Sequence, residues 1–173
     1  MELAAFMIVD LVQIRRLGEQ KFEENHKFRK YLKSRDHGDR RLRVVAQKVE
    51  EQIDCRQCGN CCREASAVVT ARDVERLAKF IGMKPAQFLR EYTDPSEEEG
   101  RVLKKTEAGC VFLVGNECSV YEARPHACEH FPHTVRGNGS IASRMWQFVD
   151  RTTYCPIVYN TIEAWKVETR FRG

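Results

Sequence analysis

Residues 55–62 read CRQCGNCC, so that four cysteines fall within eight positions. One Cys-x-x-Cys pair serves equally well as a redox dithiol or as half of a zinc site. Four sulfurs in a tight loop can instead be directed at one metal centre. Four more cysteines complete a set of eight in 173 residues: Cys110, Cys118, Cys128 and Cys155. The sequence therefore predicts metal chelation by cysteine thiolates.

Disulfide bonds are the main alternative use of so many cysteines. Chains that depend on disulfides are usually short and secreted, whereas 173 residues are enough for an apolar core. The first fourteen residues are mostly apolar, but Glu2 and Asp10 interrupt them. A signal peptide begins with positive charge, and a membrane span needs about 20 apolar residues. We therefore expect a cytoplasmic protein with reduced thiols and no membrane segment.

The net charge depends on the state of the cysteines. The formal value of +4 counts each of them as a neutral thiol. Metal-bound cysteines are thiolates, so ligation by all eight would bring the protein part to −4. Thiolates so close together repel one another unless cations lie among them. We expect the metal-free protein to be less stable around residues 55–62.

Basic residues are concentrated ahead of the cysteine loop. Residues 15–49 contain twelve Lys or Arg and five Asp or Glu, a local charge of +7. Such a segment could meet an acidic protein partner or nucleic acid. Acidic residues are interleaved with the basic ones, which favours an ordinary solvated helical surface. We expect only weak binding to duplex DNA, and we keep a protein partner of this prefix as an open option.

The spacing of apolar residues predicts a mostly helical α+β fold. We expect one long helix, or two joined near Gly18, over residues 3–31, and a second helical segment over residues 40–53. Thr70 and Asp73 form the pattern of a capping box, which begins another helix. Gly82 then closes that helix, and Pro85 begins a shorter one.

A small β-hairpin is expected in the middle of the chain. Gly115-Asn116 marks its turn, which would place Cys110 and Cys118 on facing arms. Beyond the hairpin, Arg124-Pro125 begins a helical turn that carries Cys128. The fold we expect is a single domain with a long helical prefix, a cysteine-rich metal-binding loop and this hairpin.

The expected boundaries follow from these elements. Residues 1–49 form the helical prefix, which is basic from residue 15, residues 50–165 form the cysteine-cluster domain, and residues 166–173 form a tail. Cys155 comes just before a C-terminal helix that begins at Pro156. Because a helix N-terminus lowers the pKa of a thiol, this position favours the thiolate form.

Together, these motifs resemble the YkgJ-type family of bacterial cysteine-cluster proteins, described as zinc- or iron-chelating. The resemblance covers roughly residues 50–165. It implies metal binding but no particular reaction, and a similar cysteine pattern in flagellin lysine methylases is a likeness of the cluster alone. The matching segments are residues 55–62, Thr70 with Asp73, residues 110–113, residues 118–121, Arg124-Pro125 with Cys128, Phe131-Pro132 and Cys155-Pro156.

The same cysteines fit two kinds of metal centre. Cys55, Cys58 and Cys61 have the spacing of a bacterial ferredoxin, and Cys155-Pro156 resembles the remote Cys-Pro that supplies a fourth ligand. This favours a four-iron, four-sulfur cluster. In the alternative, zinc takes Cys55 and Cys58 as one half-site and a pair such as Cys110 and Cys118 as the other. Ligand type alone does not separate the two, because both metals accept thiolates.

All eight cysteines are candidate ligands, but they need not share one centre. Neighbouring side chains usually diverge, so Cys62 could leave Cys61 and join Cys110, Cys118 and Cys128 at a second centre. One or two of these cysteines could instead be small buried apolar residues.

Two other residue types lie close to the cysteines in sequence. Arg124 could neutralise thiolate charge or donate a hydrogen bond to a cluster sulfur, or it could simply pair with a nearby carboxylate. His126, His130 and His133 surround Cys128, and an imidazole could replace a thiolate. With eight cysteines present no imidazole is required, so we expect these histidines at the surface or outside the ligand set.

The expected function is that of a metal-binding protein with an iron–sulfur cluster and a redox or metal-handling role. The alternative is a zinc-binding structural or interaction module without catalytic activity. No substrate site is evident, since Gly137-Asn138-Gly139 lacks the strand that precedes a nucleotide-binding turn. If the protein is an enzyme, we expect a metal-cluster-dependent oxidoreductase or an accessory protein.

Overall fold

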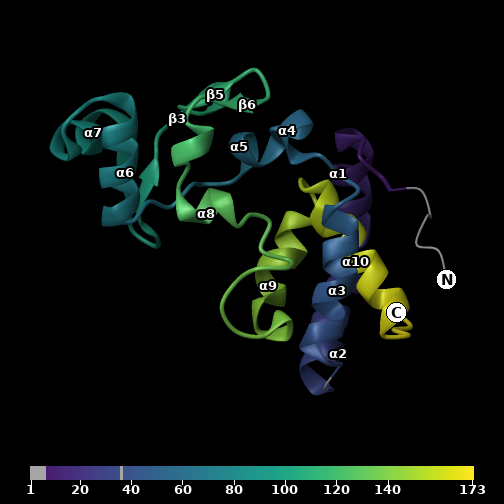
Figure 1. The fold of residues 1–173 in the computed structure, drawn as a ribbon. Helices are drawn as coiled ribbons and strands as arrows, with labels where there is room; N and C mark the ends of the chain where they lie inside the picture. Colours follow the sequence, from purple (N-terminus) through teal and green to yellow (C-terminus); the bar gives the residue numbers. More distant parts are fainter. Residues whose placement is uncertain (1–6, 36) are drawn as a thin grey trace. The chain divides into compact units, whose positions relative to one another are not determined.

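The computed structural model describes residues 7–35 and 37–173, and Figure 1 shows its helices and strands. These residues form ten α-helices and three two-stranded antiparallel sheets, so the mostly helical α+β fold predicted from the sequence is confirmed. The chain divides into two compact units. Unit 1 comprises Met1–Asp54 and Pro132–Gly173, and unit 2 comprises Cys55–Phe131.

Unit 1 is a bundle of helices in which α10 is the most buried element. Ten residues of α10 are buried, from Pro156 through Lys166. The indole Nε1 of Trp165 donates a hydrogen bond to the Leu42 carbonyl oxygen (2.8 Å) and so ties α10 to α3. The helices of unit 1 are α1 (Leu11–Gln20), α2 (Phe22–Ser34), α3 (Asp39–Glu50), α9 (Ile141–Arg151) and α10 (Pro156–Glu168). The prefix helices α1 to α3 thus pack in one unit with α9 and α10.

The break between the first two helices differs from the prediction. It falls at Lys21, whereas Gly18 lies inside α1 and is buried. A Cβ atom at residue 18 would lie 2.6 Å from the backbone oxygen of Thr152, so glycine permits close packing and does not end the helix. Residues 7–10 are not helical, and α1 begins at Leu11 after its N-cap Asp10, so the helix starts later than predicted. The predicted start at Leu3 itself lies outside the described residues.

The helix predicted over residues 40–53 is present as α3, which ends at Glu50. Its buried face consists of Leu42, Val45, Ala46 and Val49, as the three- and four-residue spacing predicts. Ile53 is buried beyond the end of the helix.

Unit 2 contains a two-helix pair followed by short strands. The helix α6 (Ala71–Ile81) has the predicted capping box of Thr70 and Asp73 and ends at Gly82, whose φ is +76°. The helix α7 (Pro85–Tyr92) begins at Pro85 and lies beside α6 (Figure 1). A separate apolar cluster holds this unit together: Val69, Val74, Leu77, Ala78, Phe88, Leu103, Phe112, Val120 and Ala123.

The β structure of unit 2 corrects one prediction. Cys110 lies in β4, which pairs with β3, whereas Cys118 lies in β6, which pairs with β5. The two cysteines therefore belong to consecutive hairpins and are not on facing arms of one. Gly115-Asn116 does form the turn of the second hairpin. The strands are β1 (Thr93–Ser96), β2 (Gly100–Leu103), β3 (Lys105–Thr106), β4 (Gly109–Cys110), β5 (Leu113–Val114) and β6 (Glu117–Cys118).

Candidate metal centre

The cysteine loop consists of two short helical turns, α4 (Cys55–Cys58) and α5 (Asn60–Glu64). Gly59 separates them with left-handed backbone angles (φ +59°, ψ 2°). The Cys62 N–H donates to the Gly59 carbonyl oxygen (3.2 Å), which fixes the direction of the second turn. Cys55 is exposed at the start of the loop, and the other three cysteines are half-buried.

The second hairpin is anchored directly on this loop. The Nη2 group of Arg63 donates to the carbonyl oxygen of Gly115 (2.8 Å) and to Oδ1 of Asn116 (2.7 Å). In return, Nδ2 of Asn116 donates to the Gln57 carbonyl oxygen (3.1 Å). A Cβ atom at Gly59 would lie 2.9 Å from the backbone carbonyl oxygen of Asn116, so this close contact requires glycine. The hairpin that carries Cys118 is thereby fixed against α4 and α5.

The first hairpin is anchored in a similar way. Nζ of Lys105 donates to the carbonyl oxygens of Arg63 (3.2 Å) and Glu64 (3.0 Å). Gly109 passes so close to the loop that its missing Cβ would lie 2.7 Å from the Cys62 oxygen. Cys110 follows directly and is thus positioned beside the end of the cysteine loop.

Helix α6 holds in place the segment that carries Cys128. The buried carboxylate of Asp73 accepts a hydrogen bond from the His126 N–H (3.1 Å) at the start of α8 (His126–Glu129). Arg76 Nη2 donates both to Asp73 Oδ1 and to the Arg124 carbonyl oxygen, each at 2.7 Å. Residues 123–126 are therefore clamped to α6, and Cys128 follows two residues later.

The carboxylate of Asp73 is charged in this setting. Burial alone would raise its pKa, but hydrogen bonds from Thr70 and His126 outweigh burial. The charge of Arg76 acts in the same direction, and the net result is a lowered pKa. An ionised acceptor makes strong hydrogen bonds, so the clamp on α8 is a firm one.

Four cysteines from four different elements come together at this point: Cys62, Cys110, Cys118 and Cys128. Each of the six possible pairs among them is close enough for the charge on one sulfur to act on another. A group of four thiols is the ligand set of a structural zinc site or of an iron site. The sequence predicts this set as one of several ways to divide the eight cysteines between metal centres. The sequence alone does not choose among them, because the choice depends on which segments meet in space.

Cys62 is the most acidic of these thiols. Its pKa is lowered to about 7, chiefly because the Cys61 side chain forms a hydrogen bond with it, and the Arg63 charge adds to the effect. Burial opposes this shift but is outweighed. Cys62 is therefore partly a thiolate near neutral pH, which is the form that a metal ion requires of a cysteine ligand.

The other three thiols are neutral in the absence of metal. Burial raises the pKa of Cys110 and of Cys118, and it raises that of Cys128 to about 12. Mutual repulsion of the sulfur charges adds to the shift in each case. A bound cation would have to displace these protons, so metal binding at this set must become weaker as the pH falls.

Arg124 lies near the same cysteines. Its guanidinium carbon is 3.8 Å from the centre of the Tyr121 ring, and Nη1 donates to the Tyr121 carbonyl oxygen (2.9 Å). Its positive charge lowers the pKa of Cys118 and Cys128, although burial prevails at both. This placement fits a role in neutralising thiolate charge.

The donor chemistry fits a soft cation, but the thiols are not arranged around an ion. All eight cysteines lie in the described part of the chain, and none is in a disulfide bond. Within residues 7–35 and 37–173, no three His, Cys, Asp or Glu side chains are arranged so that they could hold a metal ion. Binding of an ion would therefore require these thiols to rearrange towards a common centre.

The remaining candidates lie elsewhere. Cys55, Cys58 and Cys61 share the loop, and Cys155 is the buried N-cap residue of α10 in unit 1, as the sequence predicted. Its role as a metal ligand stays a prediction. Among the histidines, His126 begins α8 and His130 directly follows it in unit 2, whereas His133 belongs to unit 1.

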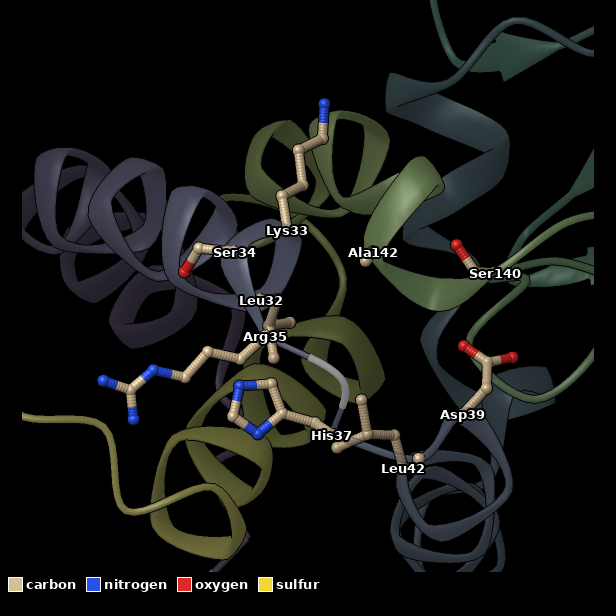
Figure 2. A pocket seen from close by; sticks show the side chains of 10 residues that line it. Leu32, Lys33, Ser34, Arg35, His37, Asp39, Leu42, Ser140 and Ala142 are labelled. Atoms are coloured by element: carbon tan, nitrogen blue, oxygen red, sulfur yellow. The ribbon is translucent and has the colours of Figure 1, made fainter.

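A hollow of about 360 Å³ lies in unit 1 and is shown in Figure 2. It is lined by the imidazole of His37 and the carboxylate of Asp39. The charged ends of Lys33 and Arg35 point away from the other labelled side chains. None of its lining residues is a cysteine, so it does not resemble the thiol-rich set of unit 2. The lining residues are Leu32, Lys33, Ser34, Arg35, His37, Gly38, Asp39, Leu42, Ser140 and Ala142.

The fold and the gathered thiols define a cysteine-rich, metal-chelating class of protein. A family model described as "Putative zinc- or iron-chelating domain", with the motif CxxCxxCC, matches residues 54–156, and the chain belongs to this family. No solved structure matches the chain. Every helix in the described residues is too short or too polar to span a bilayer.

Proposed function

We propose that the protein chelates zinc or iron at a four-thiolate centre made of Cys62, Cys110, Cys118 and Cys128. The observation that carries this proposal is the mutual proximity of all four sulfurs, which come from α5, β4, β6 and α8. The anchoring of both hairpins and of α8 around the loop supports it. Family membership independently indicates zinc or iron as the ion.

The test is a set of serine substitutions with metal analysis. Cys128→Ser and Cys110→Ser should each lower the bound metal by the same amount per chain, because each variant removes one ligand of a single centre. Cys58→Ala, which changes a loop cysteine outside the set, should retain that equivalent. If Cys128→Ser keeps the full metal content of the wild-type protein, the four-thiolate centre is wrong.

We further propose that the metal is iron in an iron–sulfur cluster, with a redox or metal-handling role. The support is the ferredoxin-like spacing of Cys55, Cys58 and Cys61, which leaves these loop cysteines as a second set of ligands. Anaerobic purification, followed by iron and sulfide analysis and low-temperature electron paramagnetic resonance, tests this proposal. Cys58→Ala should then lose the loop metal and lower the melting temperature.

A zinc-stapled interaction module is the second candidate. The observation that favours it is the shortness of β3 to β6, which have two residues each and cannot hold the cysteines in place by strand pairing alone. A zinc ion would supply folding energy there. Zinc at one equivalent, without iron, sulfide or a redox signal, would establish this alternative.

The location and partners of the protein are part of the proposal. Thiolate centres persist in reducing compartments, so we propose a cytoplasmic protein. The resemblance to the YkgJ-type bacterial cysteine-cluster proteins further implies a bacterial one. Within unit 1, several basic residues of the prefix form ion pairs, among them Lys21 with Glu163 and Arg41 with Glu168. These pairs reduce the charge available for nucleic acid, and they leave a protein partner as the better option for the prefix.

A further inference from the structure

Two histidines flank Cys128 on the short helix α8. His126 begins the helix, and His130 is the residue that follows its last turn. Their ring centres are 4.1 Å apart. His126 is exposed and His130 is half-buried, so both imidazoles are within reach of ions from solution.

The helix directs these imidazoles and the Cys128 thiol to different sides. At 3.6 residues per turn, residues four apart lie about 40° from each other around the axis, whereas residues two apart lie about 160° apart. His126 and His130 therefore share one face, and Cys128 lies on the opposite one. A pair of histidines at this spacing on one helical face is a recurrent zinc-binding arrangement.

The backbone of this turn is held before any ion arrives. The His126 N–H is bonded to the buried Asp73 carboxylate (3.1 Å), and the His130 N–H donates to the His126 carbonyl oxygen (3.2 Å). Asp73 is 2% exposed. Because the turn is anchored to α6, an ion would not have to order the backbone on binding, which favours affinity.

We propose that His126 and His130 form a second metal site, for a divalent cation that prefers nitrogen ligands, such as zinc, nickel or copper. Imidazole suits these ions, with metal–nitrogen distances of about 2.0–2.1 Å for zinc. The two imidazoles supply half of a tetrahedral set, and water supplies the remainder. The site goes beyond the proposed thiolate chelation, since it uses none of the cysteines.

The experiment adds nickel to protein whose thiols already hold zinc and which carries no affinity tag. Calorimetry should show one further equivalent of nickel in the wild-type protein and none in His126→Gln or His130→Gln. The matched control is His26→Gln, because His26 lies in unit 1 against Phe22 and should not matter. In nuclear magnetic resonance spectra, paramagnetic nickel should broaden the ring signals of His126 and His130 in the wild-type protein and equally in His26→Gln.

Three results would overturn this inference: no added nickel in the wild-type protein, an unchanged equivalent in both histidine variants, or nickel uptake matched by an equal release of zinc. The last result would place nickel at the thiols. Failure of the proposed function looks different, because the purified protein would then hold no thiolate-bound metal. The nickel uptake of His126→Gln and His130→Gln can still be compared with that of the wild-type protein in that case, so the histidine site is tested either way.

Discussion

Gly109 is a residue at which one added methyl group should disturb the metal centre. Its φ is +123°, and a Cβ atom would lie 2.7 Å from the Cys62 oxygen. Gly109→Ala should destabilise unit 2 by about 1–3 kcal/mol, because it adds backbone strain and a clash. It should also reduce metal content, since the Cys110 strand is pushed from the loop. Urea unfolding and metal analysis measure the two effects.

The control for this prediction is Gly100→Ala. Gly100 also has a positive φ, +81°, but nothing lies within 4 Å of the position that an added methyl group would take. The control should therefore lose stability through strain and keep its metal. Equal metal loss in both variants would show that the close approach to Cys62 does not matter.

Cys128 links the stability of the metal-free protein to pH. Its thiol has a pKa of 9.0 when unperturbed and about 12 in the folded protein, where burial keeps it neutral. Its contribution to stability is thus fully present below pH 9 and is lost as the pH rises towards 12. Through this group, the free energy of unfolding should fall by about 1 kcal/mol per pH unit above the unperturbed value.

Urea denaturation of metal-free wild-type protein and Cys128→Ser, at pH values on both sides of 9, checks this expectation. Serine does not ionise in this range, so the variant should lack that part of the pH dependence. Parallel pH profiles for the two proteins would mean that the Cys128 thiol is not held neutral by folding.

At the scale of elements, we expect α6 to act on the proposed metal centre through Arg76. Its guanidinium holds the carbonyl oxygen of Arg124 at 2.7 Å, ahead of Cys128. Arg76→Met should weaken metal binding by about 10–100-fold, as is typical for groups that orient a ligand from outside. Arg76→Met also removes the charge partner of the buried Asp73 carboxylate, so some stability should be lost together with metal affinity. Competition with a chromophoric chelator measures the affinity.

The matched variant for Arg76→Met is Thr70→Ala. It removes the side-chain cap of α6, which costs about 1 kcal/mol, but leaves the contacts of Asp73 with Arg76 and His126 in place. Thr70→Ala should therefore lower the melting temperature and keep the metal affinity. If Thr70→Ala weakens metal binding and Arg76→Met leaves it unchanged, the assignment of Arg76 as a positioning residue is contradicted.

Elements with a local signal could be predicted from the sequence. The α6 capping box, the Pro85 start of α7 and the apolar face of α3 were all correct, because each depends on neighbours in the chain. Helix α9 was missed, although Ser140 caps it and Ile141, Met145 and Phe148 have helical spacing. The break at Lys21 could not be found, since the role of Gly18 depends on Thr152, far along the chain.

The candidate site was predicted in composition but not in arrangement. The cysteines and the spacing of the loop are visible in the sequence. Which of them meet is decided by contacts between distant segments, such as Arg63 with Asn116 and Asp73 with His126. The sequence also placed Cys110 and Cys118 on one hairpin, because a single turn signal does not reveal the two-residue strands on either side.

At the scale of the molecule, metal removal should affect the two units unequally. All four proposed ligands lie in unit 2, whereas unit 1 has its own core around α10. A bound ion stabilises only the unit that folds around it. After chelation, hydrogen exchange should accelerate at the backbone amides of Cys110 and Cys118, and α10 should keep its protection. Equal acceleration in both units would contradict this separation.

The order of segments in the chain has a consequence for synthesis on the ribosome. Unit 2 is one continuous stretch, Cys55–Phe131, whereas unit 1 is completed only by Pro132–Gly173. At about 5–20 residues per second, the last segment takes about 2–8 s to translate. During that interval α1 to α3 still lack α9 and α10, which complete their bundle. The first helices are therefore the part of the nascent chain that most needs protection from aggregation.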